Sequence, residues 1–129
     1  MPNLTKYLLC LLLFPCLLVA ACSKGDQARI PVQVWNGIKV KIETHPYPVR
    51  AGYNEIWLMA RRVEGGPAHN IIVSLRANES KEWVQSVQDG HIGVFRRAVE
   101  VERGDRHLYV QLRDGGQSTE LKFELPWPQ

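Results

Sequence analysis

The sequence predicts an all-β domain, a sandwich or barrel built from several short antiparallel strands. From Ile30 to Leu125, apolar and polar residues alternate in successive short segments, which is the two-residue period of a strand. Turn-forming residues separate these segments at intervals of roughly ten residues. No stretch carries the helical period of about 3.6 residues, so the pattern favours an all-β fold over a helical one.

The start of the chain differs in composition from the rest. A leucine-rich run from Tyr7 to Leu18 follows Lys6, which is the pattern of a secretory signal peptide. The run is short and contains Pro15, whereas a membrane-spanning helix needs about 20 apolar residues. We therefore predict that residues 1–21 are a signal peptide that directs export.

Small residues lead directly into Cys22, and this junction resembles the bacterial lipobox. The resemblance implies that the thiol of Cys22 carries a diacylglyceryl group and that the chain is cut before this residue. Two or more acyl chains anchor a protein stably, at about 0.8 kcal/mol per buried CH₂, whereas one chain binds only marginally. The alternatives are a conventional signal cleaved near Cys22 and an uncleaved helix.

The destination follows from the same signal. Ser23 stands where an aspartate would favour retention at the inner membrane, so the resemblance implies an outer-membrane anchor with the domain in the periplasm. Residues 22–29 are polar and small, and we predict that they form a flexible tether. The expected partners are thus the membrane, through the lipid, and a protein of the cell envelope.

Cysteine usage agrees with an exported product. Cys10 and Cys16 lie in the leader, so a domain lipidated at Cys22 holds no free thiol and no disulfide. Its stability must come from burial of apolar surface, which a domain of about 100 residues can supply.

Charge gives no partner signal. The formal net charge is +3, far from the strongly basic surface of a nucleic-acid-binding protein, so we expect no nucleic-acid partner. The basic doublets Arg61-Arg62 and Arg96-Arg97 have glutamates nearby, which is typical of a solvated face. Contact with anionic lipid head groups is the alternative.

The first strands of the domain form a predicted hairpin. Ile30, Val32 and Val34 alternate with other residues, and a second alternating run covers residues 38–42. Asn36-Gly37 lies between the runs and favours a tight turn, because both turn positions need positive φ.

A proline-rich loop precedes the longest predicted strand. Residues 45–53 contain prolines that cannot donate to a strand ladder, so this segment is predicted to cross between strands. Alternation resumes over residues 55–63, with Ile56, Leu58 and Ala60 on one face. Trp57, Met59 and Arg61 lie on the other face, and Glu64-Gly65-Gly66-Pro67 ends the strand.

The remaining segments repeat this pattern. Ser74 is predicted to be an ordinary outward residue of the next strand, and one further strand is predicted over residues 82–87. Asn78-Glu79-Ser80 is predicted to be a polar turn. The inward sets are Ile71, Val73 and Leu75; Phe95, Val99 and Val101; Leu108, Val110 and Leu112; and Leu121, Phe123 and Leu125.

The run from Thr44 to Asn54, with Asp89-Gly90 before Phe95 and Gly104 before Leu108, resembles the YtkA-like and FixH-like periplasmic domains. The resemblance implies that residues 30–129 form an immunoglobulin-like antiparallel β-sandwich of about seven or eight strands. Such domains occur in bacterial lipoproteins and respiratory-assembly proteins.

This sequence departs from that family at points that bear on copper handling. Some relatives carry methionine and histidine in the middle loop, whereas residues 77–91 contain no methionine here. Arg106 stands where the family often has tryptophan, and a lipidation signal replaces the usual transmembrane helix.

Metal-binding residue types are present but scattered. His45, His69, His91, His107 and Met59 are the candidates, and no two of them share a close ligand spacing. We interpret the histidines as surface or turn residues and expect neither a metal nor another cofactor.

Catalytic patterns are also lacking. No serine stands in a nucleophile elbow, and no glycine pair precedes a helix that could bind phosphate. We assign no catalytic residue and predict a protein that is not an enzyme.

A binding role rests on Trp57 and Met59, the outward pair of the longest predicted strand. An exposed apolar pair would mark a contact site for a partner. The alternative, which we favour from the sequence, is that the Ile30–Trp35 strand or the Trp127 tail covers both side chains.

These predictions combine into a lipid-anchored, non-catalytic binding or accessory module for a membrane-associated partner. The second hypothesis, from the family resemblance and the histidines, is a copper-handling or respiratory-oxidase assembly accessory protein.

Overall fold

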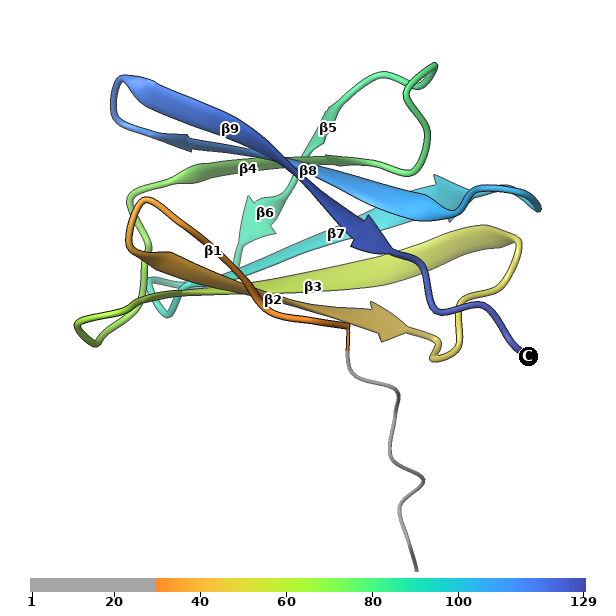
Figure 1. Ribbon diagram of the computed structural model, residues 1–129, viewed down its shortest axis with the longest axis horizontal. Coiled ribbons are helices and arrows are strands. Elements are labelled where there is room, and N and C mark those ends of the chain that lie inside the picture. The colour runs from red at the N-terminus through yellow and green to blue at the C-terminus, as the bar shows by residue number, and fades with distance from the viewer. Residues whose placement is uncertain (1–29) are drawn as a thin grey trace, which may run out of the picture.

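The computed structural model describes residues 30–129. The predicted signal peptide, Cys22 and the predicted tether lie outside the described residues. Residues 30–129 form two antiparallel sheets packed face to face, so the predicted all-β sandwich is confirmed (Figure 1). Within that range the chain forms no helix that is long and apolar enough to span a bilayer.

The first sheet has five strands and contains the longest strand of the described chain. Its spatial order is β1 (Gln33–Trp35), β2 (Ile38–His45), β3 (Gly52–Arg62), β7 (Val94–Val101) and β6 (Val87–Gln88). The long strand β3 therefore lies at the centre, paired with β2 on one side and β7 on the other.

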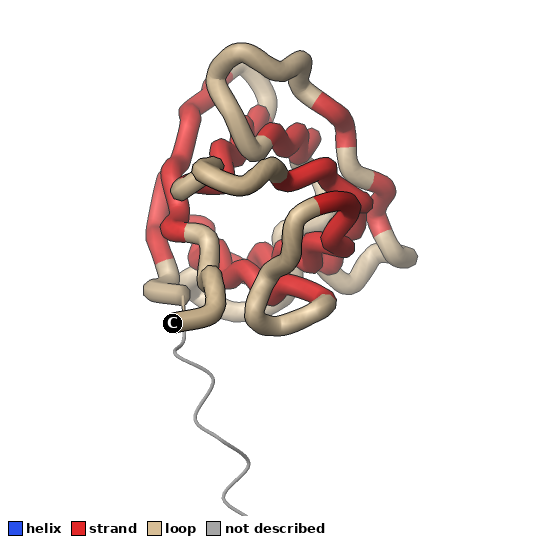
Figure 2. The backbone as a smooth tube through the Cα atoms, turned by 90° about the vertical axis from the view of Figure 1, so that its right-hand side faces the viewer, coloured by secondary structure: helices blue, strands red, loops and turns tan. Residues whose placement is uncertain are grey.

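The second sheet has four strands. Its order is β5 (Val84–Gln85), β4 (Ile72–Arg76), β8 (His107–Asp114) and β9 (Gln117–Glu124). Viewed along the sandwich, the strands of the two layers surround a single core (Figure 2). The outer face of each sheet is thus available for functional side chains.

The core contains nearly all of the predicted inward residues, with Leu121 only partly buried, and it also contains three loop residues that were not predicted, Val49, Ala68 and Ala77. Ile56, Leu58 and Ala60 of β3 are fully buried, and Val73 and Leu75 of β4 face them from the other sheet. Burying one large aliphatic side chain stabilises a fold by about 1.5–3 kcal/mol. Alternation of apolar side chains therefore fixes which face of each strand points inward.

The predicted first hairpin is present. Trp35 pairs with Ile38 across a two-residue turn in which Asn36 has φ 48° and Gly37 has φ 70°. Positive φ at both positions is the type I′ geometry that the Asn-Gly pair favours.

The proline-rich loop joins β2 to β3, and a buried asparagine holds it. The Oδ1 atom of Asn54 accepts a hydrogen bond from the Arg50 amide at 3.0 Å. Its Nδ2 atom donates to the carbonyls of Arg50 at 2.7 Å and Gly52 at 3.1 Å. These bonds replace the ladder that the prolines cannot form.

The strand predicted over residues 82–87 is divided in the structure. β5 pairs with β4 in one sheet and β6 pairs with β7 in the other, so the chain changes sheets at Ser86. The amide and the hydroxyl of Ser86 both donate to the Val73 carbonyl, at 2.9 and 2.7 Å. This division raises the number of strands to nine in the described chain, where seven or eight were expected.

Ser74 also differs from its prediction as an ordinary outward residue. It lies on the outer face of the four-stranded sheet, but only 8% of its surface is exposed. Gln85 and Gln111 stand directly opposite it on the two neighbouring strands. Because cross-strand pairs share a face, these longer side chains flank the small serine on both sides.

Candidate functional site

The outer face of the five-stranded sheet carries the predicted contact residues. The register places Glu43, Trp57, Arg96 and Val87 in one row across β2, β3, β7 and β6. Met59 lies in the next row, between Lys41 and Val94. Both Trp57 and Met59 therefore point away from the core, as the alternation predicted.

Two neighbours partly bury the Trp57 ring. The His45 ring lies 4.6 Å from it, centroid to centroid, at an interplanar angle of 46°. The Arg96 guanidinium carbon lies 4.6 Å from the Trp57 ring centroid, which is the range of a cation–π contact. We call Trp57, His45 and Arg96, together with the Glu55 carboxylate that pairs with Arg96, the Trp57 cluster.

Trp57 and Met59 are only partly exposed, but the two elements predicted to cover them do not do so. Strand β1 extends the same sheet beside β2 and does not fold over its outer side. The Trp127 ring packs against the core at the end of the sandwich, where its Nε1 atom donates to the Asp105 carbonyl at 2.6 Å. Alternation identifies the outward face of a strand but not which element covers that face.

An ion pair completes the Trp57 cluster. The Nε and Nη2 atoms of Arg96 donate to one carboxylate oxygen of Glu55, at 2.8 and 2.6 Å. This bond to Arg96 lowers the pKa of Glu55 below its usual value and raises the pKa of Arg96. Asp89 lies 3.7 Å from the Nη1 atom of Arg96, so the guanidinium is shared by two carboxylates.

The ion pair remains open to solvent. The side chains of Arg96 and Glu55 are 41% and 39% exposed. Tyr53 and Val87, which lie on the same face, are 67% and 64% exposed. Tryptophan, tyrosine and arginine are the residue types that most often dominate binding at protein interfaces.

The opposite outer face, on the four-stranded sheet, also carries a stack of rings and cations. The guanidinium carbon of Arg76 lies 4.2 Å from the Trp83 ring centroid and 5.7 Å from that of Tyr109. Arg76 also donates to the backbone carbonyls of Glu79 at 2.9 Å and Lys81 at 3.4 Å. With its side chain only 18% exposed, Arg76 holds the loop after β4 against the sheet.

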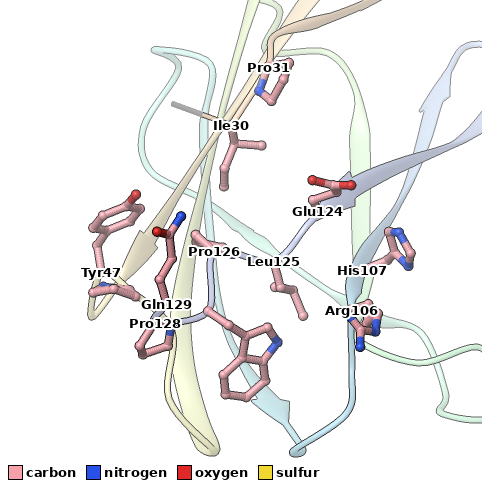
Figure 3. Close-up of a pocket in the computed structure, with 12 residues that line it drawn as sticks. Ile30, Pro31, Tyr47, Arg106, His107, Glu124, Leu125, Pro126, Pro128 and Gln129 are labelled. Atoms are coloured by element: carbon pink, nitrogen blue, oxygen red, sulfur yellow. The ribbon is translucent and has the colours of Figure 1, made fainter. Parts of the chain in front are cut away.

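A groove of about 670 Å³ lies where the two ends of the described chain meet (Figure 3). Its wall includes Ile30 and Gln129, the first and last described residues, with Arg106, His107 and Glu124 on the side opposite Tyr47. The chemistry of this groove is mixed, with prolines and aliphatic side chains beside a few charged groups.

The structure brings together two of the histidines that the sequence left scattered. The rings of His69 and His91 lie 5.7 Å apart at an interplanar angle of 83°. His45 contacts Trp57, and His107 lies 6.3 Å from Tyr109. Within residues 30–129, no group of three or more histidine, cysteine or acidic residues is placed to hold a metal ion.

Sequence reasoning identified Trp57 but missed the residues around it. Arg96 was interpreted as half of a basic doublet on a solvated face or near lipid head groups, His45 as a scattered surface or loop histidine, and Glu55 was given no role. The alternation of residues 94–101 does place Arg96 outward, but only the pairing of β3 with β7 sets it beside Trp57.

Comparison with known proteins adds no relative. No protein-family model, curated protein or solved structure matches this chain. The resemblance to YtkA-like and FixH-like domains therefore stays a prediction from its motifs.

Proposed function

We propose that this protein is a non-catalytic binding module, held at the periplasmic side of the cell envelope by a lipid on Cys22. We further propose that it contacts a membrane-associated protein through the Trp57 cluster. The observation that carries the proposal is an aromatic ring stacked with a solvent-exposed Arg–Glu pair on a sheet face that no other strand of residues 30–129 covers.

A partner that covered this face would gain both hydrophobic burial and charged contacts. Burying Trp57, Met59 and the exposed Tyr53 removes apolar surface from water, at about 25 cal/mol per Å². The charged rim of Arg96 and Glu55 gives orientation, since a partner can offer opposite charges to both groups. A ring already packed between His45 and Arg96 also loses little conformational entropy on binding.

The anchor is tested with cysteine variants in cells. We expect Cys22→Ala to abolish fatty-acid labelling and to move the protein from the membrane to the soluble fraction. Cys16→Ala, which changes a leader cysteine that lipidation does not use, serves as the matched control and should leave both unchanged. Continued labelling and sedimentation of Cys22→Ala with membranes would refute the anchor.

The contact surface is tested by crosslinking in intact cells, followed by affinity capture from solubilised membranes. We expect Trp57→Ala to reduce the captured partner by about tenfold, the effect of losing one interface hot spot of more than about 1.4 kcal/mol. Lys122→Ala, an exposed change on the other sheet, should leave capture unaltered. Equal capture by both variants would remove the Trp57 cluster from the proposal.

Handling of copper, as an accessory to oxidase assembly, remains the second proposal. The observation that favours it is the contact between His69 and His91, since imidazole nitrogen is a common ligand for copper. The two proposals rely on different groups: a partly exposed aromatic ring with an ion pair in the first, and a histidine pair in the second.

A further inference from the structure

We propose that His69 and His91 together form a binding site for one divalent transition-metal ion. The proposal deepens the second candidate function and is independent of the Trp57 cluster. It rests on where the backbone places two loops, on the distance between the rings, and on a buried nitrogen of His69.

The C-terminal end of β3, beyond its pairing with β7, brings the two loops together. The Ala60 amide donates to the Gly93 carbonyl at 2.8 Å, and the Ala60 carbonyl accepts from the Ala68 amide at 3.0 Å. His69 directly follows Ala68, and His91 lies two residues before Gly93. A single residue of β3 therefore fixes both histidine-bearing loops.

Gly93 is required for this close approach. It has φ +74°, and a Cβ atom there would lie 2.4 Å from the Ala60 carbonyl oxygen and 3.1 Å from the Cβ of Pro67. A larger residue would push the loop of His91 away from the loop of His69. The backbone is thus built to hold the two segments in contact.

The ring geometry suits a shared ion. With metal–nitrogen distances of about 2.0–2.1 Å and a roughly tetrahedral angle, two coordinating imidazoles have ring centroids about 5–6 Å apart. The His69 and His91 centroids are 5.7 Å apart, and their planes are nearly perpendicular rather than stacked. His91 is exposed, so its side chain has room to change rotamer when an ion binds.

The Nδ1 atom of His69 points to a ligand independently of the ring distance. It is buried and has no hydrogen-bond partner among the described residues. An ion bound at this nitrogen would give it the partner that the described residues do not supply.

The ligand chemistry defines the class of ion. Two imidazoles without a thiolate favour Zn²⁺, Ni²⁺ or Cu²⁺ over hard cations such as Mg²⁺ and Ca²⁺. Because the described residues supply two such ligands rather than three, water would complete the coordination shell. The site should hold the ion reversibly and should bind Cu²⁺ more tightly than Zn²⁺.

The test is calorimetric titration of the full lipidated protein in detergent, with ZnCl₂ and with CuCl₂. We expect one ion per chain, and a loss of affinity of roughly tenfold or more in His69→Ala and in His91→Ala. His91→Ala changes an exposed residue and should leave the fold intact, which keeps the test valid if His69→Ala unfolds.

His45→Ala and His107→Ala are the matched controls, because each removes an imidazole outside the pair. Unchanged affinity in both controls, with loss in His91→Ala, would support the site. Equal loss in all four variants, or no saturable binding, would overturn it. A separate assay of oxidase activity in cells that carry His91→Ala tests the function: loss of metal binding in vitro with unchanged oxidase activity would retain the site and reject the copper-handling function.

Discussion

The two outer faces of the sandwich carry the same kind of stack for different purposes. Each places an arginine on a tryptophan, Arg96 on Trp57 and Arg76 on Trp83. The Arg76 side chain is 18% exposed and donates to two backbone carbonyls, with Glu120 a further 3.7 Å partner. The Arg96 side chain is 41% exposed, and its polar partners within residues 30–129 are side-chain carboxylates. A cation bonded to the backbone holds a loop, while one bonded to exposed carboxylates can exchange its partners.

The difference explains why a cation–π contact by itself does not identify a binding site. Removing Arg76 would leave the Glu79 and Lys81 carbonyls without this donor and would free the loop after β4, which costs stability. Removing one member of an exposed ion pair leaves its partner in water, which costs little. The function of each stack therefore follows from the other partners of its arginine.

The largest expected effect is a difference in the free energy of unfolding between Arg76→Ala and Arg96→Ala. Arg76→Ala should lower the free energy of unfolding by about 2–3 kcal/mol, because it removes the stack on Trp83 and the bonds to two carbonyls. Arg96→Ala should have a clearly smaller effect. Urea unfolding followed by tryptophan fluorescence measures both, and equal destabilisation would break the comparison.

A smaller effect is the pH dependence of the Glu55–Arg96 pair. Arg96 lowers the pKa of Glu55 from its usual value of 4.5, so the pair stabilises the fold above pH 4.5. That stabilisation is lost as the pH falls through the lowered pKa. Glu55→Gln should thus be less stable than the unsubstituted protein at neutral pH, and the difference should shrink on acidification.

The Arg96→Gln background provides the control for this titration. Without the guanidinium, the change in the free energy of unfolding that Glu55→Gln causes should vary much less with pH. A pH dependence that persists in that background would assign it to another group on the face.

The smallest effect concerns Tyr109 on the opposite face. Burial, and then the negative charge of Glu79, raises the pKa of Tyr109 above its usual value of 10.0. Since the fold favours the neutral phenol, its contribution to stability is present below pH 10 and is lost as the pH rises through the raised pKa.

Tyr109→Phe should therefore remove a component of the phenolate absorbance that develops above pH 10.0. Alkaline difference spectroscopy measures this component. If the component that Tyr109→Phe removes titrates at or below pH 10.0, the pKa of Tyr109 is not raised. The Arg76 stack would then be as open to solvent as the Trp57 cluster.

Local patterns predicted most of the fold. The Asn36-Gly37 turn and the inward face of β3 follow from the sequence because turn geometry and strand alternation act over a few residues. The division at Ser86 did not follow, since one alternating run can pair with either sheet. Its two bonds to the Val73 carbonyl are contacts between distant segments that no local pattern contains.

The candidate sites show the same division between short-range and long-range information. The sequence by itself determined that Trp57 points outward, because side chains alternate along a strand. Only the tertiary structure decided that Arg96 lies on its ring and that His69 meets His91. Strand pairing and loop packing join residues far apart in the chain, and the free energy of those contacts depends on the whole fold.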